Sequence, residues 1–199
     1  MLILAFDTAT DVATVALVRD DQVLGERASR AVRVLKDAEA LLEEAGLASI
    51  DLDGIAVGTG PGSYTGLRMG LVTARTLSIS LGVPVAGIST LDALAAGSPG
   101  AVPVVDARRK ELFTLVGGRP TCLAAADLQV EPGSTYVGDG AVKYRDEIAT
   151  AGGIVLPDDA PEHVPWARHH AFLARDFGPG DAAAPIYLRA PDAERALAR

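Results

Sequence analysis

Residues 58–68 constrain the fold more than any other part of the chain. They read Gly-Thr-Gly-Pro-Gly-Ser-Tyr-Thr-Gly-Leu-Arg, between an apolar strand-like run and a long apolar helix. Glycine tolerates the sharp backbone bends that such a segment needs. Ser63 and Thr65 place hydroxyls at the predicted helix start, where the first N–H groups lack partners. The segment predicts either a rigid strand-to-helix turn or a phosphate site at a helix N-terminus.

The charge and the cysteine content limit which partners the chain can bind and which cellular compartment it can occupy. The 199 residues have a net charge of −8 and a pI near 4.8, whereas direct nucleic-acid binding needs clustered Lys and Arg. Any role with nucleic acid would therefore run through a partner. Cys122 is the single cysteine, which excludes an intramolecular disulfide. Asp7 interrupts the apolar N-terminus, so we expect a first strand rather than a signal peptide, in a cytoplasmic protein with no membrane partner.

Apolar runs and turn residues predict the order βββαβαβα for the first half. The predicted strands are 2–7, 13–18, 22–28, 54–57 and 83–87. Apolar residues at helical spacing predict a helix over 31–46 and another over 65–81, and a third opens at Ser89 or Thr90. Both long helices have broad apolar faces, which are typical of a core or of an association surface.

The second half repeats the pattern of the first in reduced form. After a hinge at 97–100, an apolar strand ends at Asp106 and a second strand covers 112–116, as the first strand ends at Asp7 and is followed by the strand 13–18. A strand at 135–137, a turn at 138–140, a loop at 151–164 and a helix at 166–177 follow. We expect two lobes of common design, at 1–98 and 99–182, and a C-terminal tail at 183–199.

Several familiar chemistries do not match the residues. A phosphate loop of the Walker type needs a lysine directly after the glycines, and none stands there. A two-metal nuclease needs several converging acids, but neither strand 54–57 nor helix 65–81 carries one. His163, His169 and His170 lack the spacing of a zinc site, so we expect them to be exposed or to face a partner. Ser63 is not in a nucleophile elbow. None of these patterns therefore predicts a metal site or a catalytic residue.

The quoted motifs resemble those of the TsaB family, formerly called YeaZ. The resemblance rests on Phe6-Asp7-Thr8-Ala9-Thr10, on residues 56–68, and on Val105-Asp106-Ala107-Arg108-Arg109 with Glu111. Gly138-Asp139-Gly140 and Pro185-Ile186-Tyr187-Leu188-Arg189 extend it to nearly the whole chain. It implies a two-lobed actin-like fold of the RNase H-like class, with a reduced second lobe. It also implies a non-catalytic subunit of the machinery that makes threonylcarbamoyladenosine in tRNA.

The resemblance assigns roles by position. Asp7, Thr8 and Thr10 would form a degenerate phosphate-binding turn, with Asp106 and Arg108 as its second-lobe counterpart. The motif loop would comprise Gly60, Pro61, Gly62, Ser63, Thr65, Gly66 and Arg68. The helices 31–46 and 65–81 would meet a TsaD-like catalytic subunit through Leu35, Leu42, Met69 and Val72. Arg30-Ala31 stand where family members commonly carry His-Ser.

Three functional hypotheses follow. The first is a scaffold that activates a TsaD-like enzyme beside a TsaE-like ATPase, contacts tRNA only through the complex and forms a homodimer when alone. We expect no tightly bound cofactor in this scaffold. The ligand that the resemblance leaves open is ATP or ADP at the partner interface. The second is an independent actin-like ATPase or small-molecule kinase, with Asp7 and Asp106 as its acids. The third is a protease, an older view of the wider family. The resemblance associates metal-binding histidines in the early helical region with the TsaD-like subunit, and this chain has no histidine before His163.

Overall fold

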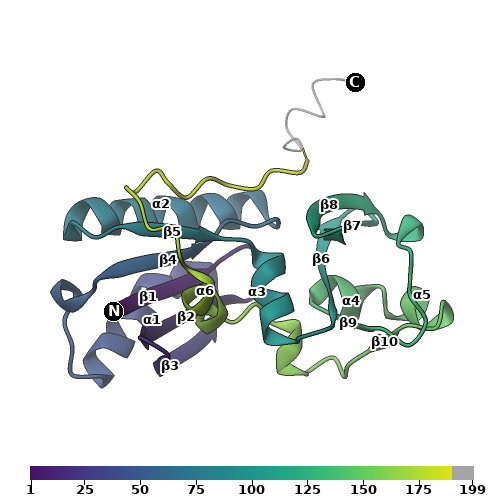
Figure 1. Ribbon diagram of the computed structural model, residues 1–199, viewed down its shortest axis with the longest axis horizontal. Helices are drawn as coiled ribbons and strands as arrows, with labels where there is room; N and C mark the ends of the chain where they lie inside the picture. The colour runs from purple at the N-terminus through teal and green to yellow at the C-terminus, as the bar shows by residue number, and fades with distance from the viewer. Residues whose placement is uncertain (190–199) are drawn as a thin grey trace.

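Two lobes lie side by side in the structure, a computed structural model that describes residues 1–189 (Figure 1). Each lobe is built on one five-stranded mixed sheet. The N-terminus lies at the far end of the first lobe, and the last described residues lie near the junction of the lobes. Within residues 1–189, no helix is both long enough and apolar enough to cross a bilayer.

The first sheet has the strand order β3-β2-β1-β4-β5. The first three strands form an antiparallel meander, and β4 and β5 extend it with parallel pairing. The bounds are β1 Leu2–Asp7, β2 Ala13–Arg19, β3 Gln22–Ser29, β4 Gly54–Gly58 and β5 Val85–Ile88. The order βββαβαβα predicted along the chain is confirmed. The fifth strand starts two residues later than predicted, at Val85 after Pro84, which has no N–H for a ladder.

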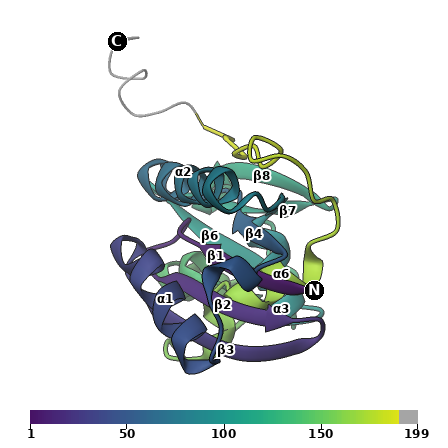
Figure 2. The same ribbon diagram turned by 90° about the vertical axis from the view of Figure 1, so that its left-hand side faces the viewer.

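Helices cover both faces of this sheet. Alternate residues of β1 point to opposite faces, so Leu2, Leu4 and Phe6 pack with α1 (Val34–Glu44) and α2 (Tyr64–Leu81). Ile3 and Ala5 pack with α6 (Ala167–Leu173) on the other face. Figure 2 shows α1 and α2 on one side and α6 on the other. Because both faces are covered, β1 and β4 are buried throughout.

The second sheet repeats the order of the first. It runs β10-β9-β6-β7-β8, with β6 in the central place that β1 holds in the first sheet. Its strands are β6 Val102–Arg108, β7 Glu111–Val116, β8 Arg119–Ala124, β9 Thr135–Val137 and β10 Ile154–Val155. The helices α4 (Asp139–Lys143) and α5 (Arg145–Thr150) are short. The internal repeat predicted from Asp7 and Asp106 is confirmed by this shared topology.

Several element boundaries differ from the predictions. The helix predicted over 31–46 divides into a 3-10 turn at Ala31–Arg33 and α1. The predicted turn at 138–140 instead opens α4, and the predicted loop at 151–164 contains β10 and a 3-10 turn. β8 was missed because its sequence, Arg-Pro-Thr-Cys-Leu-Ala, has a proline as its second residue and lies at a sheet edge.

The chain crosses between the lobes more than once. α3 (Thr90–Gly97) contacts both α6 and β6, so it connects the two sheets. The predicted division assigns α6 to the second lobe, whereas α6 packs on the first sheet. The reason is its apolar face of Ala167, Ala171 and Ala174, small residues that let the helix approach β1 and β2 closely. Of the predicted tail at 183–199, residues 190–199 lie outside the described part.

Candidate functional site

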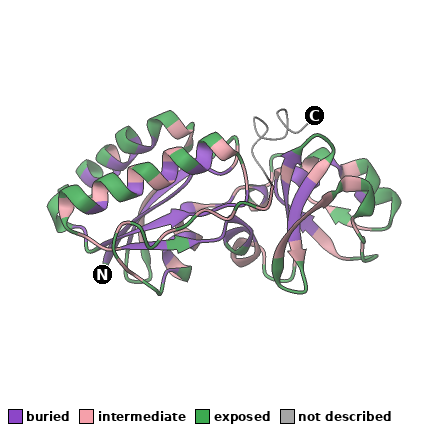
Figure 3. Ribbon diagram, turned by 90° about the horizontal axis from the view of Figure 1, so that it is seen from above, coloured by how far each residue is buried: buried purple, intermediate pink, exposed green. Residues whose placement is uncertain are grey.

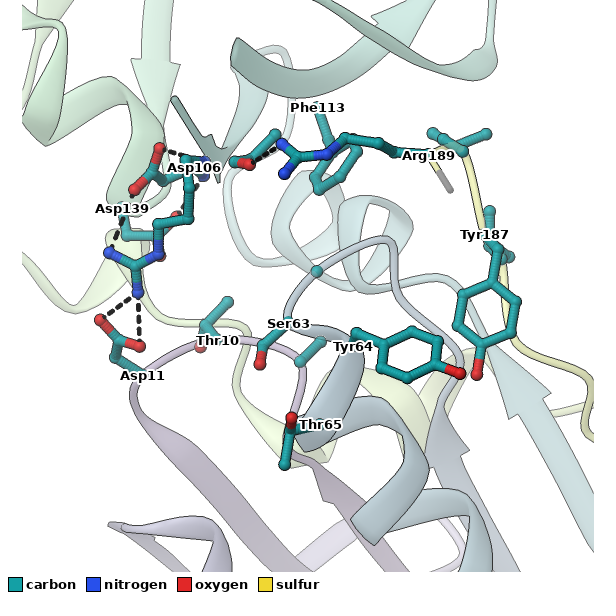
Figure 4. Close-up of a pocket in the computed structure, with 16 residues that line it drawn as sticks. Thr10, Asp11, Ser63, Tyr64, Thr65, Asp106, Phe113, Asp139, Tyr187 and Arg189 are labelled. Atoms are coloured by element: carbon teal, nitrogen blue, oxygen red, sulfur yellow. Dashed lines mark hydrogen bonds and ion pairs between the residues drawn. The ribbon is translucent and has the colours of Figure 1, made fainter. Parts of the chain in front are cut away.

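A cavity of about 420 Å³ lies where the lobes meet (Figure 4). The first lobe contributes the turn after β1 and the start of α2, and the second contributes the end of β6. The C-terminal segment forms the remaining wall. The lining residues are Ala9, Thr10, Asp11, Gly62, Ser63, Tyr64, Thr65, Asp106, Ala107, Arg108, Phe113, Asp139, Ile186, Tyr187, Leu188 and Arg189. Thr10, Asp106 and Arg108, all predicted site residues, are thus brought together from two lobes.

The glycines of the motif loop make room for the turn that follows β1. A Cβ added to Gly66 would lie 2.0 Å from the carbonyl oxygen of Thr8, and one added to Gly62 would lie 2.3 Å from that of Ala9. Ser63 N–H also donates to the Ala9 carbonyl at 2.7 Å. Gly60 has a φ of +87°, which favours glycine, and Pro61 follows it in the buried part of the loop. The glycines therefore dock α2 directly on the β1–β2 turn.

The start of α2 is capped from within the chain. Ser63 Oγ accepts from the Gly66 N–H at 3.3 Å, as expected of an N-cap serine. Thr65 is exposed on the cavity wall, and Thr8 is buried with its hydroxyl donating to the Gly66 carbonyl at 2.7 Å. The Arg68 guanidinium lies over the Tyr64 ring, 4.7 Å from its centroid. Thr8 therefore holds the helix and does not line the cavity.

Asp7 is buried below the cavity and fully engaged. Its Oδ2 lies 2.8 Å from His170 Nε2 and accepts from the Thr90 hydroxyl at 2.7 Å, while its Oδ1 accepts from the Ala9 N–H at 2.6 Å. Burial alone would raise the pKa of Asp7, but the charge and hydrogen bonds of His170, with those from Thr90 and Ala9, lower the pKa below its usual value. Asp7 joins β1, α3 and α6.

Asp106, the second-lobe counterpart of Asp7, has charged partners at the surface. It accepts from Lys143 Nζ at 2.8 and 2.9 Å and from the Arg108 N–H at 2.9 Å. Its own N–H donates to Asp139 Oδ1 at 2.9 Å. Burial, followed by the neighbouring charge of Asp106, raises the pKa of Asp139 even though this hydrogen bond opposes the shift. Arg108 also forms an ion pair with Asp11 across the lobe boundary, in which its Nη2 lies 2.7 Å from each carboxylate oxygen (Figure 4).

The actin-like fold expected from the sequence implies a nucleotide with its metal ion between the lobes. Both oxygens of Asp7 are engaged inside the fold, and those of Asp106 are shared with Lys143 and Arg108. Among residues 1–189, no group of three or more His, Cys, Asp and Glu side chains is placed to hold a metal. The carboxylates present do not fit a metal-bound nucleotide held through Asp7. The nucleotide contacts of Thr10, Asp106 and Arg108 stay predictions.

The histidine prediction is wrong for two of the three residues. His170 is fully buried against Asp7, and His163 is buried with its Nδ1 accepting from the Gly138 N–H at 3.1 Å. Burial lowers the pKa of the half-buried His169 to about 4, and the charges of Arg168 and His170 add to this effect. No local pattern marks the His163–Gly138 and His170–Asp7 contacts, because the two residues of each pair lie at least 25 positions apart along the chain. Asp11, Tyr187 and Arg189 line the cavity and were likewise not predicted as site residues.

A second hollow of about 640 Å³ lies between α1 and α2, on the face away from α6. Its apolar lining residues are Leu4, Leu35, Ala38, Leu42, Leu47, Ala48, Leu52, Leu77 and Leu81. Of the predicted interface residues, Leu35 and Val72 are exposed and Met69 is half-buried. Leu42 is only 7% exposed and belongs to the core, since the helix turns it toward the sheet. Figure 3 shows the exposed outer faces of these helices.

Comparison with known proteins gives consistent matches. A family model described as "TsaD: tRNA N6-adenosine threonylcarbamoyltransferase" matches residues 23–134. An uncharacterized protein of Mycobacterium tuberculosis is 36% identical over 217 residues, covering 96% of this chain and 93% of the relative. The "tRNA threonylcarbamoyladenosine biosynthesis protein TsaB" of Bacillus subtilis is 39% identical over 123 residues, covering 57% of this chain and 54% of the relative.

The solved structures agree with the sequence matches. "YeaZ from Pseudomonas aeruginosa" superposes with a TM-score of 0.79 at 27% identity, covering 94% of this chain and 99% of that one. The shared strand order of the two sheets and this match identify the fold as actin-like. The fold predicted from the sequence is thus confirmed. The chain belongs to the TsaB (YeaZ) family, within the wider family that the TsaD model describes.

Proposed function

We propose that this protein acts in tRNA threonylcarbamoyladenosine biosynthesis as a non-catalytic subunit that supports a TsaD-like catalytic partner. The observation that carries the proposal is the exposed apolar surface of α1 and α2 in a chain of the TsaB family. Leu35 of α1, Val72 and Ile79 of α2, and Val32 in the 3-10 turn just before α1 are between 56% and 78% exposed. We call these four residues the α1–α2 surface.

The α1–α2 surface suits a partner with apolar side chains. One of its residues, Leu35, lines the hollow between the two helices, which offers a place for an inserted side chain. Lys36, Glu39 and Glu43 also line that hollow and supply a charged rim. An apolar centre with a polar rim is the usual arrangement of protein interfaces. The same surface would serve a homodimer of the free protein.

The cleft between the lobes favours a supporting role over independent catalysis. An ATPase or kinase needs a free carboxylate beside bound phosphates and a metal. Asp7 is buried against His170, and Asp106 is paired with Lys143. We propose that ATP or ADP acts at the partner interface, beside a TsaE-like ATPase. The net charge of −8 favours tRNA contact through the partner.

Charge substitution on the α1–α2 surface tests the proposal. Val72→Glu and Leu35→Glu place a carboxylate in an apolar interface, so we expect binding to the TsaD-like subunit to weaken by roughly 30-fold or more. Val116→Glu is the matched control, because Val116 is 54% exposed and lies in the second lobe. Leu42→Glu is unsuitable because it would disturb the core.

Calorimetry with the purified partner, with and without ATP, measures these affinities and the nucleotide dependence. If both Val72→Glu and Leu35→Glu bind the partner as tightly as the parent does, the α1–α2 surface is not the interface.

Depletion of the protein in its host, followed by mass spectrometry of tRNA nucleosides, tests the pathway itself. Unchanged threonylcarbamoyladenosine would contradict the proposed function. Turnover of ATP by the protein alone, lost in Asp7→Asn, would favour the kinase or ATPase hypothesis.

A further inference from the structure

The C-terminal segment 178–189 returns along the first lobe and ends on the second. It pairs with the edge of β5 through Gly178 and Val85, and then runs beside α2 toward the junction of the lobes (Figure 1). Gly180 lies close to Ser78 and Arg75 near the end of α2, whereas Tyr187 stacks on Tyr64 at its beginning. The segment therefore runs antiparallel to α2 over the length of the helix.

Residues 186–189 make contacts with both lobes in turn. The Ile186 N–H donates to the Thr59 carbonyl of the first lobe at 2.8 Å, and the Tyr187 and Tyr64 ring centroids are 5.2 Å apart. Arg189 then donates to two acceptors of the second lobe, the Ala107 carbonyl at 2.7 Å and Glu111 Oε2 at 2.8 Å. We call residues 186–189 the latch.

Leu188 adds an apolar contact at the junction itself. It packs against a cluster formed by Leu91 and Leu94 of α3 with Val105, Ala107 and Phe113 of the second sheet. The Arg189 side chain is only 15% exposed and that of Glu111 is 28% exposed. An ion pair so shielded, with an additional hydrogen bond to a carbonyl, is held more firmly than one at the surface.

The latch and a second connection stand on different walls of the cavity between the lobes. The four latch residues form one wall, and the Arg108–Asp11 ion pair spans another (Figure 4). Both members of that pair are well exposed, with side-chain exposures of 60% and 73%, so it contributes little to holding the lobes. Most of the side-chain restraint across the cavity mouth thus comes from the latch.

We propose that residues 186–189 form a releasable latch that fixes the angle between the lobes and covers the cavity between them. Release of the latch separates the first turn of α2 from the second lobe and opens the cavity. The two chain crossings through α3 and the segment before α6 stay in place and act as the hinge. This device requires no partner, so its test uses the protein alone and is independent of the proposed function.

Spin-label distances between the lobes test the latch. In a Cys122→Ser background, labels at Asp21→Cys and Asp146→Cys lie on exposed positions of the first and second lobes. We expect the parent to give one narrow distance distribution. The double variant Tyr187→Ala/Arg189→Ala should broaden the distribution or shift it by several ångströms. Arg27→Ala is the matched control, because its ion pair with Glu44 lies within the first lobe, and it should keep the parent distribution.

Hydrogen exchange at the Ile186 amide gives a second measurement. Its hydrogen bond to Thr59 should protect it in the parent, and the double variant should exchange it at least tenfold faster. A circular dichroism spectrum like that of the parent verifies that the double variant is folded. Unchanged lobe distances in the double variant overturn the proposal, even where Ile186 exchanges faster, because the segment would then detach without moving the lobes. Parent-like exchange at Ile186 overturns it as well.

Discussion

The two lobes share one strand order but use it differently. In the first lobe, α1 has 11 residues and α2 has 18, and both lie on one sheet face. In the second, α4 and α5 have only 5 and 6 residues. The equivalent acids differ as well, since Asp7 is buried with His170 and Asp106 meets the exposed Lys143. The comparison teaches that a repeated strand pattern sets topology, while the inserted helices decide which lobe can offer a binding surface.

The equivalent acids give the largest expected contrast. Asp7→Ala leaves His170 buried without its partner, which costs about 3–5 kcal/mol of unfolding free energy. The Asp106 side chain is only 5% exposed, but its partners Lys143 and Arg108 are 42% and 60% exposed. Asp106→Ala therefore leaves no buried charge without a partner, and we expect it to cost about 1 kcal/mol or less. Urea denaturation of both variants checks the comparison. Equal losses of unfolding free energy in the two variants would contradict the expected difference between the two aspartates.

The glycines that dock helices on the central strands give the next contrast. Gly66→Ala places a Cβ 2.0 Å from the Thr8 carbonyl oxygen, so the helix or the turn must move, at a cost of about 2–3 kcal/mol. In the second lobe, Gly140→Ala places its Cβ 2.8 Å from Val105 C, and a smaller loss is expected. Thermal unfolding monitored by circular dichroism measures both. A greater loss for Gly140→Ala would reverse the proposed order.

Mild acid should weaken the first lobe through His169. Its pKa is lowered to about 4 in the fold, so between pH 6.5 and about 4 the unfolded state binds more protons and stability falls with falling pH. For a fully buried group this shift would correspond to about 3 kcal/mol, and partial exposure reduces the expectation to about 1 kcal/mol. His169→Gln should flatten the dependence of unfolding free energy on pH from 7 to 5. A slope equal to that of the parent would exclude His169 as its source.

Asp139 should give a small effect of opposite sign in the second lobe. Its raised pKa means that, between the usual value and the folded value, the folded state holds more protons and stability falls as pH rises. Asp139→Asn keeps an oxygen for the Asp106 N–H and removes the charge, so we expect a gain of about 1 kcal/mol or less at pH 7. Denaturant titrations at pH 7 and pH 4 measure it, and a loss at pH 7 would contradict this account.

Local sequence patterns determined much of the fold. Apolar runs between turn residues predicted β1 to β4. Helical spacing, with the hydroxyls of Ser63 and Thr65 near its start, predicted α2 to within one residue. The recurrence of a strand ending in aspartate, at Asp7 and Asp106, predicted the repeat of the two sheets. Such signals are readable because hydrophobic periodicity and capping involve residues close together along the chain.

The tertiary structure alone decided what those residues touch. It paired Asp7 with His170, placed α6 on the first sheet and brought the segment 186–189 across the cleft. It also separated Leu42 in the core from Leu35 on the surface, although both lie on the same predicted helix. The physical reason is that burial and long-range pairing depend on which elements meet in space. A side chain's neighbours, and with them its charge state and accessibility, follow only from that packing.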